Sequence, residues 1–270
     1  MGAQVVAELE QVHAPEASFA PTAAGAGIEL YWLPLGAGGW FVRLNGRVWE
    51  AVQARREHRR PLDLYHTALV VRVPEGRFVV EDCWPIPNAD GPSRGVLVEG
   101  PVFGRRLGRW RGFRYEVRCW PGGTIADAGQ AVASPQLLSD DPVVARRLLE
   151  LIGFLPAPVW GRDELGTGEM WNSNSVIAWL LARSGLPTEA IRPPAGGRAP
   201  GWQAGLTVAN RSPNGIDDAA TVPPLVNFKE RLRGDLKHQT RTGTWFTATR
   251  RERSKCSASS WACWSSLTAL

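Results

Sequence analysis

Lysine is missing from the first 209 residues of this 270-residue chain, although that stretch contains 21 arginines. Its 21 aspartates and glutamates balance the arginines, so the stretch has no net charge. The remaining segment holds ten Lys and Arg against five acids, and with them the whole +5 excess. A nucleic-acid-binding domain clusters its basic residues on the folded part. We therefore expect no nucleic-acid partner for residues 1–209, which leaves only the basic C-terminal segment as a route to one.

Cysteines and long apolar runs are also scarce. The four cysteines show neither the C-x-x-C spacing nor the accompanying histidines of a zinc site, so we expect no metal and no cofactor. The longest apolar stretch is interrupted by Arg146, Arg147 and Glu150, and so falls short of a membrane span. The first thirty residues lack the features of a secretory signal. These absences predict a cytoplasmic chain with no membrane partner.

Composition divides the chain into three parts. Residues 1–28 form a loose leader rich in Ala, Pro and Gly, and residues 29–209 are expected to form one domain. Residues 210–270 contain all three lysines, clustered Ser and Thr, and no helical or strand periodicity, which predicts a disordered or poorly packed tail. Two interpretations of the tail stay open: a foreign segment from a fusion or a shifted reading frame, or an ordinary basic C-terminus.

The pattern of residues 29–209 predicts an α+β fold with an antiparallel sheet packed against helices. Alternating or β-branched runs predict strands at 28–35, 65–73, 77–84, 95–103 and 113–120. Helical spacing and end signals predict helices at 45–60, 139–154 and 171–185, and Pro/Gly-rich 193–202 is expected to be a surface loop. In the first helix Val48, Ala51 and Val52 share one face and the basic residues share the other.

One histidine, one acid and one hydroxyl fall where nucleophilic catalysis would need them. His66 opens a predicted strand, Glu81 and Asp82 end its hairpin partner, and Ser173 lies at a helix start. A hydroxyl needs a base to take its proton, the base needs an orienting acceptor, and a helix N-terminus offers N–H groups to an oxyanion. If Glu75-Gly76 is a two-residue turn, Glu81 pairs with position 70 on the face of His66; a three-residue loop would substitute Asp82.

A family resemblance connects these motifs. The order LYHTALVV, RFVVEDCWP and, much later, MWNSNSVIAWLL resembles permuted papain-like proteins of the NlpC type, including the lecithin retinol acyltransferase-like families, over roughly residues 30–205. The resemblance implies a circularly permuted papain-like fold whose catalytic cysteine follows an Asn at a helix start. On that match His66 is the base, Glu81 is the third polar residue, and Ser173 stands in the place of the cysteine.

The resemblance implies a hydrolase or acyltransferase that acts on an amide, peptide or ester. Because a serine has no low-pKa thiolate form, Ser173 would depend on His66 for activation. The alternative is a catalytically silent domain that binds a peptide or cell-wall fragment in the same cleft. Either way we expect a small-molecule or peptide partner, while the sequence gives no oligomeric state. The residues expected to line the substrate site are Asn172, Asn174, Trp171 and Trp160, although capping alone also explains the two asparagines.

Overall fold

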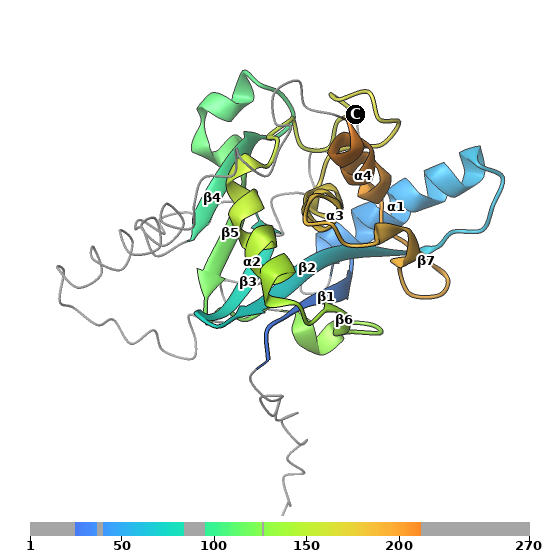
Figure 1. Cartoon of the computed structure of the whole chain (residues 1–270). Coiled ribbons are helices and arrows are strands. Elements are labelled where there is room, and N and C mark those ends of the chain that lie inside the picture. The colour runs from blue at the N-terminus through green and yellow to red at the C-terminus, as the bar shows by residue number, and fades with distance from the viewer. Residues whose placement is uncertain (1–24, 37–39, 84–94, 126, 212–270) are drawn as a thin grey trace, which may run out of the picture.

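The computed structural model describes residues 25–36, 40–83, 95–125 and 127–211. An open β-sheet forms the centre of this part of the chain (Figure 1). Its strands run in the order β4-β5-β3-β2-β1-β6, and neighbours on this path are antiparallel. The predicted α+β class with an antiparallel sheet is confirmed. Most of the expected leader and nearly all of the tail lie outside the described residues. The strands are β1 (Gly27–Pro34), β2 (Asp63–Val73), β3 (Gly76–Cys83), β4 (Val96–Pro101), β5 (Arg114–Pro121), β6 (Gln136–Ser139) and β7 (Gly197–Arg198).

Helices flank this sheet. They are α1 (Trp40–Arg56), α2 (Pro142–Leu151), α3 (Ser173–Arg183) and α4 (Trp202–Asn210), with short 3-10 turns η2 (Leu107–Arg109), η3 (Arg111–Phe113), η4 (Ala128–Gln130), η5 (Ile152–Phe154) and η6 (Thr188–Ala190). The start of α2 follows its sequence signals, because Asp141 accepts a hydrogen bond from the Val143 N–H at 2.7 Å and Pro142 occupies the first turn. Gly185, at φ 90°, follows the last turn of α3, as glycine does at helix ends.

The two faces of the sheet have different partners. The inner face, which includes Leu30, Leu69 and Val80, packs with α2 and α3 in the main core (Figure 1). The outer face, which includes Ala68 and Val79, forms a smaller apolar cluster with residues near η4. Strand side chains alternate between faces, so each strand residue belongs to one side or the other.

Three features of the structure differ from the sequence predictions. Helix α1 starts at Trp40 rather than near 45, and its Val48 and Val52 side chains are exposed rather than packed. Residues 193–202, expected to be an irregular loop, contain β7, which pairs in parallel with the first residues of β2. Helix α4 and strand β6 were not predicted, because nine and four residues give too little periodicity to recognise.

Asp82 is the polar residue that the core accommodates worst. It lies on the inner face with Val80 and is 3% exposed, and among the residues that the structure describes neither of its carboxyl oxygens has a hydrogen-bond partner. Burial, and secondarily the nearby charge of Glu81, raises the pKa of the Asp82 carboxyl well above its usual range. Burial in the folded protein therefore favours the protonated form of this carboxyl.

We predict that Asp82→Asn increases stability, and increasingly so as pH rises. A raised folded-state pKa stabilises the wild type fully at pH values below the unfolded pKa, and that stability is lost as pH rises toward the folded pKa. Asparagine has a similar shape and no proton to lose. Urea denaturation at pH 4 and pH 8 should show the advantage of the variant growing to about 1–3 kcal/mol. The exposed Asp63→Asn is the control, and a pH-independent difference at position 82 would contradict the assignment.

Candidate functional site

The first turn of α3 is fastened to β2 by the side chain of Asn174. The Thr67 hydroxyl donates to Asn174 Oδ1 at 3.0 Å, while Asn174 Nδ2 donates to the Tyr65 and Pro200 carbonyls, each at 2.9 Å. Asn174 is 2% exposed and Thr67 is fully buried. The most polar turn of the protein is therefore held against the strand that carries His66.

Asn174 occupies a place where the sheet is open. Within the described residues the β2–β3 pairing stops at Leu69 and Val80, although β2 begins at Asp63 and β3 continues to Cys83. The Leu64 carbonyl accepts from Leu35 on the β1 side, so the next carbonyl along the strand points toward β3. Asn174 Nδ2 donates to this Tyr65 carbonyl, which in a continuous ladder would accept from a β3 residue. The start of α3 thus lies at an opening between β2 and β3.

Ser173 differs from its three polar neighbours in this turn. Asn172 caps the helix, accepting from Asn174 N at 3.0 Å and Ser175 N at 3.3 Å, and Ser175 Oγ accepts from Asn172 N at 3.1 Å. Asn174 is committed to β2. Within the described part of the chain, Ser173 Oγ takes part in none of these hydrogen bonds. The residue as a whole is 8% exposed. Capping therefore accounts for the neighbours of Ser173 and leaves its hydroxyl available.

His66 and Glu81 share the outer face of the sheet. His66 pairs with Leu33 and lies on the same face of β2 as Ala68 and Val70, whereas Thr67, on the other face, points to α3. The hairpin turn is Pro74-Glu75, and its register, continued by one residue, brings Glu81 beside Ala68 rather than beside Val70. The shift is by two residues, so the predicted face holds.

The register also separates Asp82 from His66. Asp82 follows Val80 onto the inner face, opposite the outer face that carries His66 and Glu81. The alternative in which Asp82 replaces Glu81 behind His66 is therefore wrong. Ser173 begins the helix that covers the inner face, whereas His66 lies on the outer face; the two residues are nearest in the fold where Asn174 contacts Tyr65 and Thr67, on either side of His66.

The outer face of the sheet also holds charged side chains that are buried or partly buried, namely Glu81, Glu116 and Arg118. Glu116 is fully buried, and its Oε2 accepts from Arg118 Nη2 at 2.6 Å and Nε at 3.0 Å. Arg118 pairs directly with Glu81 across the strands, but its guanidinium is committed to Glu116. Desolvation, increased by the nearby charge of Asp127 and partly offset by Arg118, raises the pKa of Glu81 to about 7.

His66 is buried and electrically neutral at ordinary pH. It is 4% exposed, and burial lowers the pKa of its imidazole to about 4. A neutral imidazole can accept a proton from a hydroxyl that reaches it, and Glu81 is on the same face to interact with the resulting imidazolium. Near neutral pH the His66 imidazole is therefore neutral, while the Glu81 carboxyl is partly ionised.

The four residues expected to line a substrate site have mainly structural roles. Trp171 is 2% exposed and Trp160 is 8% exposed, and both belong to the main core, so the prediction that they form groove walls is wrong. Trp160 packs on Tyr115 with ring centroids 5.3 Å apart. Asn172 and Asn174 are taken up by the cap and the strand contact. Tryptophans in a sequence signal burial more than binding, which explains the error.

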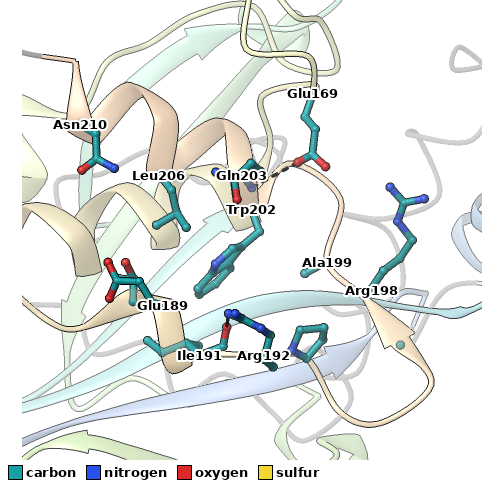
Figure 2. Close-up of a pocket in the computed structure, with 13 residues that line it drawn as sticks. Glu169, Glu189, Ile191, Arg192, Arg198, Ala199, Trp202, Gln203, Leu206 and Asn210 are labelled. Carbon is teal, nitrogen blue, oxygen red and sulfur yellow. Dashed lines mark hydrogen bonds between the residues drawn. The ribbon is translucent and has the colours of Figure 1, made fainter.

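A pocket of about 490 Å³ lies against α4, and no sequence pattern predicted it (Figure 2). The Trp202 ring and Leu206 of α4 contribute apolar surface, while Glu189 and Arg192 bring opposite charges. Glu169 lies on its rim, and its Oε2 accepts from Gly201 N at 2.9 Å and Gln203 N at 3.2 Å. Ser173 and His66 are not among the lining residues, but Pro200 and Gly201, which connect the lining residues Ala199 and Trp202, accept hydrogen bonds from Asn172 and Ser175 of the α3 turn.

Comparisons with known proteins add no relative. A scan against protein-family models, a search of curated proteins and a search of solved structures each found no match. Within the described residues, no group of three or more His, Cys, Asp or Glu side chains is arranged to hold a metal ion. None of the described helices combines the length and apolarity required to cross a bilayer.

We expect Asn174→Ala to destabilise the fold strongly and Ser173→Ala to destabilise it little. Removing the Asn174 side chain deletes its bonds to Thr67, Tyr65 and Pro200 and leaves buried groups unpaired, so unfolding free energy should fall by about 2–4 kcal/mol. Ser173→Ala removes no described bond and should cost under about 1 kcal/mol. Chemical denaturation of both variants measures the difference. A comparable loss in Ser173→Ala would assign that hydroxyl a structural role.

Proposed function

We propose that the domain has a permuted papain-like fold and is a hydrolase or acyltransferase for an amide, peptide or ester. Ser173 is the nucleophile, His66 the general base and Glu81 the residue that orients it. The observation that carries the proposal is the opening between β2 and β3, which is bordered by Tyr65 and Thr67 on either side of His66 and filled by Asn174, the residue after Ser173.

The chemistry follows from the positions of these groups. The Ser173 hydroxyl transfers its proton to His66 as its oxygen attacks the carbonyl carbon of the substrate, and His66 returns the proton to the leaving group. Glu81 stabilises the imidazolium. Ser173 is the first residue of α3, and N–H groups at a helix start are positioned to stabilise negative charge on an oxyanion. Because Asn172 accepts from the N–H groups of Asn174 and Ser175, the Ser173 N–H is the donor that the cap leaves for the oxyanion.

A second candidate is a catalytically silent domain that binds a peptide, and the pocket beside α4 favours it. Its lining combines an indole, aliphatic groups and both signs of charge, which suits the mixed chemistry of a short peptide better than a purely apolar ligand. Under this alternative Ser173 and His66 would be remnants, and the peptide would bind against Trp202, Glu189 and Arg192.

Labelling with a fluorophosphonate distinguishes these two functions. The enzyme proposal predicts that the probe attaches to Ser173 in the wild type, as mapped by mass spectrometry of the labelled protein. Ser173→Ala and His66→Ala should each abolish labelling, whereas Ser184→Ala, which alters another buried serine, should not. A wild type that is folded but unlabelled would refute the enzyme proposal and favour the peptide-binding one.

The labelling rate should depend on pH through Glu81. The carboxylate stabilises the imidazolium far better than the neutral carboxyl does, because it carries a negative charge, and the pKa of about 7 means that this form develops as pH rises through neutrality. The rate constant should therefore rise between pH 6 and pH 8. Glu81→Gln should label at least about tenfold more slowly at pH 8 and lose this step in the profile. An unchanged profile in the variant would exclude Glu81 from the mechanism.

A further inference from the structure

Helix α1 turns small and polar residues toward the domain and aliphatic residues toward solvent, the reverse of an ordinary surface helix. The side that faces the domain includes Gly46, Glu50 and Ala54, which recur every four residues, and Glu50 and Ala54 are buried. Gly46 lies so close to the body of the domain that an added Cβ would come within 2.7 Å of the Leu35 side chain. Glu50, 2% exposed, is held by Arg59 and by the Leu62 N–H at 2.9 Å. The polar and small residues of this helix thus attach it to the domain.

The opposite side of α1 is apolar and exposed. Leu44, Val48 and Val52 are 44%, 56% and 45% exposed, and their four-residue spacing places them in one row. Each residue of this row precedes a residue of the domain-facing row by two positions, which is a rotation of about 200° around the helix, so the row points away from the domain. Figure 1 shows α1 at the edge of the molecule, with its C-terminal half extending beyond the sheet.

Positive charge surrounds this row. Arg43, Arg47, Arg55 and Arg56 are all exposed, and the acid of the helix, Glu50, is buried and paired. By helical position Arg55 lies within the apolar row, and Arg47 and Arg56 flank it on its two sides. An exposed apolar row on a helix whose exposed charged residues are all arginines is typical of a helix that lies in the plane of an anionic lipid surface.

We propose that the exposed face of α1, defined by Leu44, Val48, Val52 and the four arginines, docks on a membrane surface that contains anionic lipids. The aliphatic side chains enter the boundary between head groups and acyl chains, and the guanidinium groups bind lipid phosphates. The face is a convex ridge rather than a groove, so a deformable lipid surface suits it better than a rigid protein partner. This site is separate from the Ser173 turn.

Co-sedimentation of the full chain with vesicles tests the proposal. We expect binding to vesicles of phosphatidylcholine and phosphatidylglycerol, weakened by salt, and little binding to phosphatidylcholine alone. The triple variant L44S/V48S/V52S should lower the partition coefficient at least about tenfold. The matched control V132S/L137S/V143S changes three other exposed aliphatic residues of the same types and should bind like the wild type.

Charge is tested with a second pair of variants. R47Q/R56Q should weaken binding several-fold and reduce its salt dependence, whereas R106Q/R109Q, in an exposed stretch elsewhere, should not. The basic C-terminal segment is present in every variant, so it contributes an equal background. Undiminished vesicle binding by L44S/V48S/V52S would overturn the proposal. A wild-type dimer in light scattering that this triple variant dissociates would also overturn it, since a second copy would then cover the face.

Discussion

The contact between Asn174 and β2 determines how the rest of the domain is arranged. One carboxamide satisfies the Thr67 hydroxyl, the Tyr65 carbonyl and the Pro200 carbonyl, so it fixes the start of α3, the end of the β2–β3 ladder and the segment that leads into α4. All three partners are far from Asn174 in the chain or separated from it by a whole helix. A buried amide with this many partners specifies one geometry, because any displacement leaves several polar groups unpaired.

Most of the elements were predictable because their signals are local. The β2–β3 hairpin has β-branched residues on both sides of a short turn. Both α2 and α3 have an N-cap and apolar spacing within a few residues, and α3 also has a terminating glycine. The inverted packing of α1 was not predictable, because its apolar row is the usual sign of a buried face. Only the tertiary partners of Gly46 and Glu50 decide which side of this helix is covered.

For the proposed site, the face of the sheet on which each residue lies was predictable, whereas the geometry around these residues was less so. Period-two alternation placed Glu81 on the face of His66 even though the turn was assigned one residue too late, because an error of two in pairing preserves the face. The opening between β2 and β3 had no sequence signal, since it depends on where two strands stop pairing. Trp160 and Trp171 were misplaced for a related reason: an indole packs in a core or lines a groove with the same local sequence.

The proposed chemistry depends on whether His66 reaches Ser173 through the opening that Asn174 fills. A crystal structure of the protein after reaction with a fluorophosphonate measures this directly. The account predicts a phosphonyl group on Ser173 Oγ and an imidazole nitrogen of His66 within about 3.5 Å of that oxygen. A separation of more than about 6 Å, or a phosphonyl group on another residue, would contradict it.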